Sequence, residues 1–458
     1  MTATRQPRPK PGPPRSYHFP RTERATLDNG LHIVVAPIRR LPVVTVLGLV
    51  DAGAARDPRL RAGVASLTAR LMAEGAGNLE GAELTEALES VGATLDSGAD
   101  WDSAMHSMTT TSANLEVAFD LFTSILRHPT FRERELDRLK AERLSDLLQL
   151  RAEPRGLADE IFATALYDHS SRFSLPEGGS EASVGAITRD DVLRFYSTWY
   201  TPHTTTLVVT GDVDLETIRA LAERNFRDWE SKTAPPHPIT DRPARSIRTI
   251  HLVNKADAPQ SELRVGQVGI PRSHPDYFDV VIMNALLGGL FNSRINLNLR
   301  EEHAYTYGAS SGFDWRRNCG PFVVTAAVET GVTADAMRET FHEIDRMRSE
   351  PVSSDELSLA ISYLDGVFPI RYETTAAVAA ALAGQIVYGL PPDYFDTYRS
   401  RIRAVTAASV LTAAQRHLDT RQMQVVVVGN SDQIRGQVEA LKLGPVLDLD
   451  PAVLSEAR

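Results

Sequence analysis

Two stretches of this chain share one pattern of apolar and polar positions. In residues 192–212 and again in residues 410–430, apolar side chains first recur at helical spacing and then form a run rich in β-branched residues. Helical spacing indicates one buried helix face, and a short β-branched run that ends in glycine is typical of a buried strand. Each stretch therefore predicts an amphipathic helix, a turn and a core strand, closed by Gly211 in the first and Gly429 in the second.

The same order of elements occurs twice along the chain. Pro129 precedes a predicted helix in the first half and Pro351 does so in the second, while the strand at 45–50 has a counterpart at 264–270. The matched features are displaced by about 220 residues in each case. Agreement of three features in one order indicates an internal duplication, so we predict two homologous domains.

Each predicted domain mixes strands with helices. Strands at 31–35 and 43–50 come first and resemble a hairpin, helices follow, and one strand closes the domain. The turn Asp28-Asn29-Gly30 supports the opening hairpin, because Asn-Gly favours tight turns. The predicted fold class is α+β, with two homologous domains, each a mixed, mainly antiparallel sheet with helices packed on one face.

A proline-rich stretch marks the boundary between the two copies. Prolines 235, 236, 238 and 243 lie within residues 230–247, which is typical of a linker. The first 23 residues are also rich in proline and arginine and predict an extended, disordered leader. The predicted organisation is a leader at 1–23, a first domain at 24–232, a linker at 233–247, a second domain at 248–445 and a tail at 446–458.

Length and composition are those of a globular protein with more than one core. The chain has 458 residues, of which 42% are apolar and 24% charged, and its formal net charge of −10 argues against a nucleic-acid partner. Cys319 is the one cysteine, which forbids an intrachain disulfide and favours a reducing, cytoplasmic compartment. Apolar runs fall short of the roughly 18 residues that span a bilayer, so we expect no membrane partner.

Several segments resemble the insulinase/pitrilysin-like zinc metallopeptidases, in the branch that includes mitochondrial processing peptidase and its bacterial relatives. The segments that carry the resemblance are 27–31, 186–191, 200–202, 208–213 and 287–307, and it extends from about residue 24 to about residue 430. The resemblance implies two homologous α+β domains that form half of a clamshell. In such proteins two chains, or two linked halves, close around an unfolded peptide.

The resemblance places a zinc-binding helix at residues 60–75, but its motif is missing. Catalytic relatives carry His-x-x-Glu-His, in which two His side chains on one helix face bind zinc and the Glu activates water. These positions hold Ser66, Ala69 and Arg70, and Asp146 lies near the position of the third ligand, a Glu. Serine is a poor zinc ligand, alanine has no base and arginine repels a dication. We therefore expect no cofactor in this chain and zinc in a partner subunit.

The 12 histidines offer no replacement on a single helix. None lies three or four residues from another, the spacing that would put two on one helix face. Histidines such as His106, His128, His169 and His203 could converge only through tertiary structure. A surface or hydrogen-bonded role is the simpler interpretation of each.

A second motif of the family is intact in the other domain. Relatives place an Arg and a Tyr there, seven residues apart, facing the zinc site of the partner, and here they are Arg300 and Tyr307, downstream of Gly288 and Gly289. A guanidinium donates from a rigid fork and a phenol donates one proton. The resemblance therefore implies catalytic and substrate-binding roles for Arg300 and Tyr307 and a substrate-binding role for Gly288 and Gly289.

Two functions of different classes fit these motifs. In the first, the chain is the non-zinc subunit of a heterodimeric zinc metalloendopeptidase. A homologous partner with an intact His-x-x-Glu-His motif cleaves short or unfolded peptides, and this chain supplies the facing substrate-binding wall with Arg300 and Tyr307. In the alternative, it is an inert scaffold or peptide-binding subunit of a larger complex. Retention of Arg300 and Tyr307 favours the first. A third interpretation, an independent hydrolase, is set aside for want of a Gly-x-Ser-x-Gly elbow, a Walker loop or a Rossmann fingerprint, and the substrate stays open.

Overall fold

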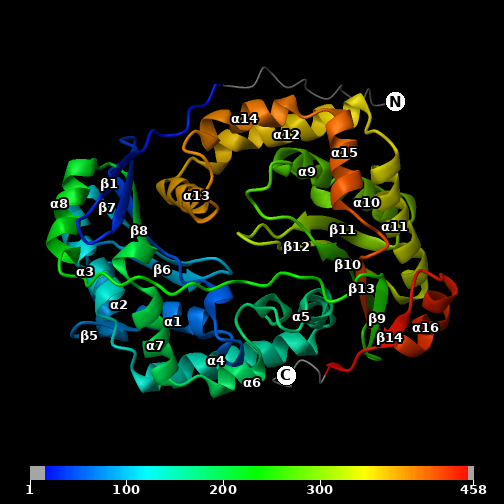
Figure 1. Ribbon diagram of the computed structural model, residues 1–458, viewed down its shortest axis with the longest axis horizontal. Coiled ribbons are helices and arrows are strands. Elements are labelled where there is room, and N and C mark those ends of the chain that lie inside the picture. The colour runs from blue at the N-terminus through cyan, green and yellow to red at the C-terminus, as the bar shows by residue number, and fades with distance from the viewer. Residues whose placement is uncertain (1–15, 452–458) are drawn as a thin grey trace, which may run out of the picture.

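The first domain is built on a six-stranded sheet. The computed structural model describes residues 16–451 (Figure 1). The strands of this sheet lie in the order β1-β2-β8-β3-β7-β6. Its strands are β1 (Glu23–Thr26), β2 (His32–Pro37), β3 (Val43–Val50), β6 (Thr94–Ala99), β7 (Ala104–Thr111) and β8 (Thr205–Gly211). Only β2 and β8 run parallel among these neighbours. A separate two-stranded ribbon joins β4 (Gly75–Ala76) to β5 (Leu79–Glu80).

The second domain repeats this sheet. Its order is β11-β12-β10-β13-β9-β14, with strands β9 (Thr249–Asn254), β10 (Gln260–Val268), β11 (Thr306–Phe313), β12 (Pro321–Glu329), β13 (Gln424–Gly429) and β14 (Val446–Asp448). Strands β3 and β10 occupy the same position in the two sheets, as do β8 and β13. The predicted class, two homologous and mainly antiparallel α+β domains, is confirmed.

The helices follow one order in both domains. In the first they are α1 (Val64–Met72), α2 (Gly81–Ser90), α3 (Leu115–Arg127), α4 (Glu133–Ala152), α5 (Pro154–Leu166), α6 (Glu181–Ala186), α7 (Arg189–Trp199) and α8 (Leu215–Phe226). In the second they are α9 (Tyr277–Asn284), α10 (Arg294–Asn296), α11 (Thr333–Ser349), α12 (Ser354–Arg371), α13 (Thr375–Val387), α14 (Tyr394–Ala404), α15 (Ala407–His417) and α16 (Ser431–Ala440). The predicted helix–strand units correspond to α7–β8 and α15–β13.

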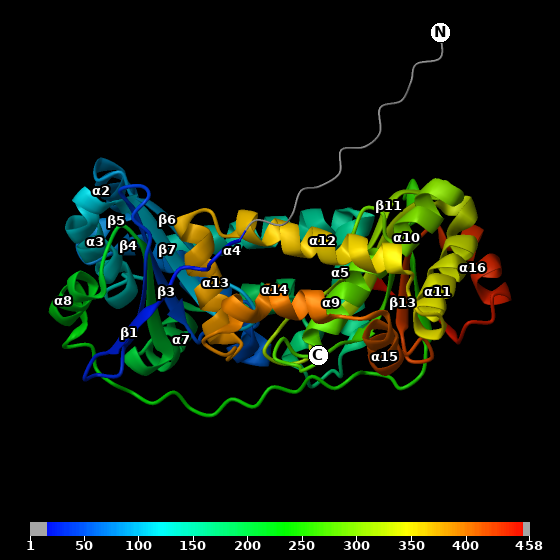
Figure 2. The ribbon, with the colours of Figure 1, turned by 90° about the horizontal axis from the view of Figure 1, so that it is seen from above.

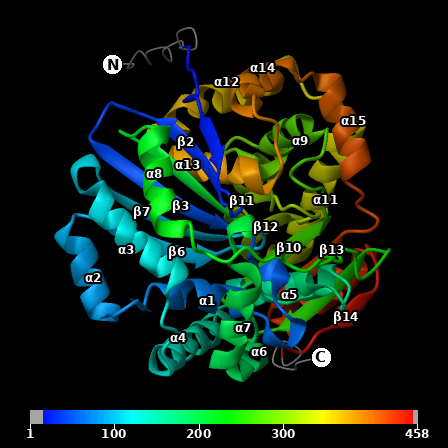
Figure 3. The same cartoon turned by 60° about the vertical axis from the view of Figure 1, so that its left-hand side comes forward.

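One helix of each domain packs on the sheet of the other domain (Figure 3). Helix α5 of the first domain packs on β10 and β13, where Ile161 shares a core with Val426. Helix α13 of the second domain packs on β3 and β8, where Leu382 shares a core with Leu47. Because α5 and α13 are equivalent in the two copies, the contact is reciprocal and buries apolar surface on both sheets.

The strand pairing differs from the predicted opening hairpin. Strands β2 and β3 are not neighbours, because β8, the last strand of the domain, lies between them. The Asp28-Asn29-Gly30 turn instead joins β1 to β2, and Gly30 has φ 95°, a conformation that glycine adopts without strain. The central strand β8 comes from the end of the domain, so its pairing with β2 and β3 is non-local. Periodicity along the chain cannot reveal such a pairing.

Both predicted ends of the folded part need correction. Residues 1–15 of the predicted leader lie outside the described residues, but Phe19 is buried and stacks on Phe395 with ring centroids 4.0 Å apart. The Tyr17 hydroxyl donates to the carbonyl of Tyr372 at 3.2 Å. The predicted tail begins with β14, which pairs with β9 in the second sheet. Aromatic burial and backbone pairing therefore order both segments.

One segment, Tyr277–Glu302, is long and apolar enough to cross a membrane by composition alone. In the fold, 61% of its apolar window is buried inside the protein, and Val280, Leu287 and Leu299 belong to the core of the second domain. Such burial is typical of a core helix.

Hairpin tips from the two domains also meet. The Arg316 guanidinium lies over the Trp101 ring at 4.2 Å, and the backbone N–H of Arg317 donates to the Asp102 carboxylate at 2.9 Å. Nearby Glu177 has its pKa raised to about 7, chiefly by burial and then by the charge of Asp100. This domain contact therefore holds a carboxyl group that is costly to ionise.

Replacing Phe19 by Ala should lower the free energy of unfolding by about 2–4 kcal/mol, because it removes an aromatic side chain that is 9% exposed. Chemical denaturation of the full chain measures the change. The adjacent exposed residue provides the control, and His18→Ala should change stability by less than about 0.5 kcal/mol. Equal stability of the Phe19→Ala variant and the wild type would show that residues 16–22 do not pack in solution.

Replacing Glu177 by Gln should stabilise the protein at pH 8. The folded-state pKa lies above the ordinary value of 4.5, so protonation favours the fold at low pH and this contribution is lost as the pH rises toward 7. We expect a gain of about 1–3 kcal/mol at pH 8 that disappears below about pH 4.5. Denaturation at several pH values measures it, with exposed Glu153→Gln as the control. A gain that is constant with pH would contradict the assignment.

Candidate functional site

The helix that would carry the zinc motif is present without its ligands. Helix α1 begins after Gly63, and the carboxylate of buried Asp57 accepts hydrogen bonds from the backbone N–H groups of Gly63 at 2.6 Å and Ala65 at 2.9 Å. Arg172 pairs with the same carboxylate at 3.0 Å. Burial raises the pKa of Asp57, while Arg172 and the two N–H groups oppose this rise. A buried side chain therefore fixes the start of α1 independently of any metal.

An arginine in an ion pair occupies one of the positions expected of zinc ligands. Arg70 on α1 pairs with Glu142 on α4 at 2.6 Å, Ala69 is buried, and Ser66 is partly exposed. Asp146 lies one turn beyond Glu142 on α4, close to Arg143. The pKa of Arg143 is lowered chiefly by burial, and the charge of Arg70 lowers it further while that of Asp146 raises it. Two arginines at this point make the site unsuitable for a dication. The zinc motif is thus replaced by a charged contact between α1 and α4.

The Arg300 and Tyr307 side chains lie on a short irregular stretch of the second domain. Arg300 is in the π-helical stretch Leu297–Glu302, where its guanidinium lies over the exposed Phe291 ring at 4.4 Å and its Nε is 3.5 Å from the Glu301 carboxylate. Tyr307 is the second residue of β11, and its side chain is 93% exposed. Both donors are accessible to a molecule that approaches this edge of the sheet.

Two asparagines, buried Asn296 and half-buried Asn284, join the segment before Arg300 to β11. The Asn296 amide donates to the carbonyl of Phe291 at 2.7 Å, and its oxygen accepts from the backbone N–H of Ala309 at 3.0 Å. Asn284 makes a reciprocal pair with Ser311, accepting from its hydroxyl at 2.8 Å and donating to its carbonyl at 3.2 Å. Sequence reasoning missed Asn284 and Asn296, since their partners on β11 lie 13 or 27 residues away in the chain.

The two glycines allow the close approach that these hydrogen bonds need. A Cβ at buried Gly288 would lie 2.4 Å from Oγ and 2.5 Å from the backbone nitrogen of Ser311. A Cβ at exposed Gly289 would lie 3.0 Å from the Asn284 amide nitrogen. Gly288 therefore packs against the strand behind the site, whereas Gly289 faces solvent.

A serine pattern that the sequence interpretation passed over also lies here. Residues 308–312 read Gly-Ala-Ser-Ser-Gly, formally the pattern of a nucleophile elbow. The structure places all five residues inside β11, where the Ser310 hydroxyl pairs with that of Thr325 at 3.0 Å. A nucleophile elbow needs a strand-to-helix turn, so this match has no catalytic meaning.

The β6 edge of the first sheet and the β11 edge of the second sheet face one side of the molecule. Figure 2 shows β6, α4, α12, α10 and β11 along one side and the extended segment between the domains along the opposite side. Strands β6 and β11 are the outermost strands of their sheets. Exposed apolar side chains on these helices and on the adjoining loop are Leu148, Leu150, Leu359, Tyr363, Ile370 and Phe291.

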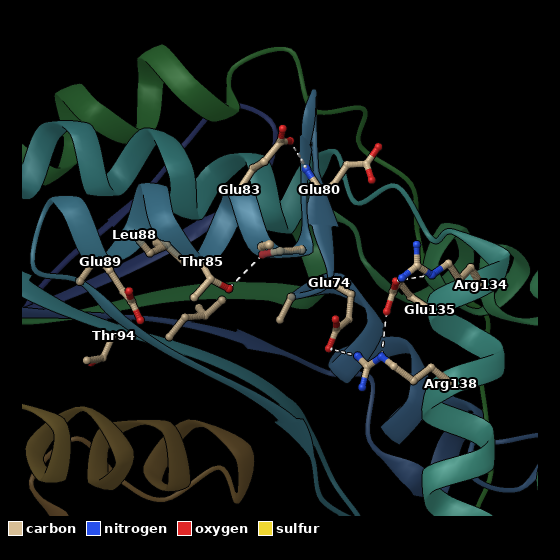
Figure 4. A pocket seen from close by; sticks show the side chains of 15 residues that line it. Glu74, Glu80, Glu83, Thr85, Leu88, Glu89, Thr94, Arg134, Glu135 and Arg138 are labelled. Carbon is tan, nitrogen blue, oxygen red and sulfur yellow. Dashed lines mark hydrogen bonds and ion pairs between the residues drawn. The ribbon is translucent and has the colours of Figure 1, made fainter.

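A groove of about 890 Å³ lies beside β6 (Figure 4). Leu88 and Leu95 contribute apolar surface, and most of its acidic groups are already paired. Arg138, for example, binds Glu74 at 2.7 Å and Glu135 at 2.8 Å. The pair with Glu74 joins α4 to the segment before the β4–β5 ribbon, whereas Glu135 lies on α4 itself.

Comparisons with known proteins agree with this architecture. The model for insulinase (peptidase family M16) matches residues 38–173, and the model for the peptidase M16 inactive domain matches residues 186–364. Together they cover more than half of the chain, which therefore belongs to the insulinase family, M16. The second match contains Arg300 and Tyr307, and the first contains the helix with Ser66, Ala69 and Arg70.

Individual relatives are distant but extend along nearly the whole chain. An uncharacterized zinc protease of Streptomyces coelicolor is 22% identical over 88% of this chain and 89% of its own. Mitochondrial-processing peptidase subunit beta of Lentinula edodes is 23% identical over 91% of each. Among solved structures, a peptidase M16 inactive domain from Pseudomonas fluorescens has a TM-score of 0.84 at 24% identity, covering 89% of this chain and 98% of its own.

Replacing Gly288 by Ala should disrupt the contact between the glycine stretch and β11. A methyl group 2.4 Å from Ser311 Oγ requires a backbone shift, which typically costs about 1–3 kcal/mol. Denaturant unfolding tests this, with Gly312→Ala on the same strand as the control because its Cβ would meet nothing within 4 Å. Equal stability of the two variants would contradict the packing role of Gly288.

Proposed function

We propose that this chain is the non-zinc subunit of a heterodimeric metalloendopeptidase, in which a homologous partner with an intact His-x-x-Glu-His motif holds the zinc. One contrast carries the proposal. Arg70, paired with Glu142, stands where a zinc ligand is expected, while Arg300 is partly exposed and Tyr307 fully exposed on a firmly held stretch. A chain that only maintained its fold would have no need to present the second pair.

In this proposal Arg300 and Tyr307 act on the substrate held by the partner. A guanidinium and a phenol can both donate hydrogen bonds to the carbonyl oxygen of a scissile peptide bond. These bonds strengthen as negative charge develops on that oxygen, so the pair stabilises the tetrahedral transition state. Zinc in the partner would supply the activated water. The stacking of Arg300 on Phe291 restricts the guanidinium before substrate arrives.

The partner surface is proposed on the side that carries both sheet edges. The exposed apolar residues of α4 and α12 are suited to burial against another chain. Short or unfolded peptides are the proposed substrates, because a chamber between two chains excludes folded proteins. We place the complex in the cytoplasm, on the basis of the single cysteine.

An inert scaffold is the alternative, and one comparison favours it. A chain of Complex III2 from Candida albicans matches with a TM-score of 0.75 at 15% identity, covering 93% of this chain. A scaffold would keep the two-domain fold and its interaction surfaces, but cleavage would not depend on Arg300 or Tyr307.

The isolated chain should not hydrolyse unfolded peptides, even with added zinc, whereas a mixture with the zinc subunit should do so and should elute from gel filtration as one complex. Peptide cleavage followed by mass spectrometry, with and without a chelator, measures this. Chelator-sensitive cleavage by the highly purified chain alone would overturn the proposal.

In the complex, Arg300→Ala or Tyr307→Phe should lower turnover by about 10²–10³, the usual effect of losing one oxyanion donor. Arg300→Lys should be nearly as damaging, because an ammonium cannot reproduce the planar fork. Glu302→Ala, at an exposed neighbouring position, is the matched control and should keep wild-type turnover. If every variant forms the complex and cleaves at the wild-type rate, the scaffold function is correct.

A further inference from the structure

Two histidines and one aspartate from distant parts of the chain meet between α9 and α15. His417 is the last residue of α15, Asp276 is the N-cap of α9, and His274 lies two residues before it. Within residues 16–451, this is the one set of three His, Cys, Asp or Glu side chains whose possible ligand atoms all lie within 4.8 Å of one another. Tertiary structure has thus created a histidine cluster that sequence spacing does not contain.

The donors are already close to one another. Nε2 of His417 lies 2.7 Å from a carboxylate oxygen of Asp276. The rings of His274 and His417 meet edge to face, with centroids 4.9 Å apart. The backbone N–H of Asp276 donates to Nδ1 of His274 at 3.1 Å, so the lone pair of that nitrogen is engaged and becomes available to a metal only when the side chain rotates away from this bond.

A simple charge contact explains part of this cluster. Asp276 at the start of α9 attracts Arg416 and His417 at the end of α15, as helix dipoles favour. That contact gives no role to His274, whose imidazole is turned toward the same pair. A second imidazole beside a His–carboxylate pair is instead the composition of a transition-metal site.

The expectation of no metal in this chain concerned the motif positions on α1; at this separate place we propose that His274, Asp276 and His417 bind one divalent transition-metal ion of the Zn²⁺, Ni²⁺ or Co²⁺ type. Two imidazoles and one carboxylate suit these ions, whereas Mg²⁺ and Ca²⁺ prefer oxygen ligands. Metal–nitrogen bonds of about 2.0–2.1 Å require the donor atoms to lie closer together than the widest present separation. A side-chain rotation of His274 supplies that change, and the fourth position is left for water.

The surroundings hold two of the ligands in place. The Gln267 amide donates to the carbonyl of His417 at 3.0 Å, and its oxygen accepts from the backbone N–H of Asp419 at 2.7 Å, which fixes the end of α15. The His417 side chain is 7% exposed and that of Asp276 is 21% exposed, so both are partly shielded from competing water. The bound ion would join α9 to α15 and stabilise the second domain by mass action.

Arg416 competes with the metal ion for the Asp276 carboxylate. Its guanidinium lies 2.6 Å from the same Asp276 oxygen, and its side chain is 59% exposed, so it can turn into solvent when a metal binds. Its positive charge must nevertheless weaken binding. Removal of this charge should therefore increase metal affinity, an effect opposite to that of removing a ligand.

The test uses the full chain alone, freed of metal by a chelator and then dialysed. Calorimetric titration with Zn²⁺ should give one ion per chain, and Co²⁺ should give a visible absorption band. His274→Gln and His417→Gln should each weaken binding at least tenfold and abolish the Co²⁺ band, while Arg416→Gln should tighten binding. His342→Gln, an exposed histidine on α11, is the matched control and should bind as the wild type does.

Two results would overturn this proposal: no stoichiometric binding by the wild type, or one-to-one binding that persists unchanged in both histidine variants. His274→Gln is the decisive variant, because it leaves the Asp276–His417 contact intact and keeps the fold. Neither result bears on peptide cleavage, because the cleavage proposal concerns Arg300, Tyr307 and the zinc of a partner chain. The two proposals therefore fail independently.

Discussion

The reciprocal packing of α5 and α13 is the contact on which the rest of the structure depends. Each helix is apolar on the surface that it places on the sheet of the other domain, with Ile161 against Val426 on one side and Leu382 against Leu47 on the other. Neither sheet could expose these valines and leucines to water without a large loss of hydrophobic stabilisation. The two domains therefore share their cores, and polar contacts such as Arg264 with Asp159 at 2.5 Å add orientation to the apolar contact.

Helix α1 keeps its place in the first domain without zinc ligands. Helix α1 is held by the Asp57 carboxylate at its start and by the Arg70–Glu142 pair along its side. These contacts need no metal, so the loss of zinc ligands leaves no uncompensated charge between α1 and α4. The stretch around Arg300 is held differently. Gly288, Asn284 and Asn296 fix its backbone, while the Arg300 and Tyr307 side chains have few contacts with the rest of the chain.

Much of the fold could be predicted because its signals are local. The periodicity of 192–212 and 410–430 gave α7–β8 and α15–β13, and the repeated order gave the duplication. The position of β8 between β2 and β3 could not be predicted, since a strand register depends on partners far away in the chain. The same limit applies to the site. Ser66, Ala69, Arg70, Arg300 and Tyr307 are found by motif, whereas Asn296 and the cluster of His274 with His417 exist only in three dimensions.

The N-terminal segment has a mechanical consequence. Phe19 and Tyr17 attach the chain to the second domain before it enters β1 of the first, and the extended segment before β9 returns it to the second domain on the way out. The first domain is thus tethered at both of its ends, in addition to its exchanged helix. Such a closed path removes the hinge freedom that a single linker would allow. Helix α1 and the Arg300 stretch consequently keep a fixed separation, so in the proposed heterodimer an opening that admits a peptide would lie between the chains rather than within one.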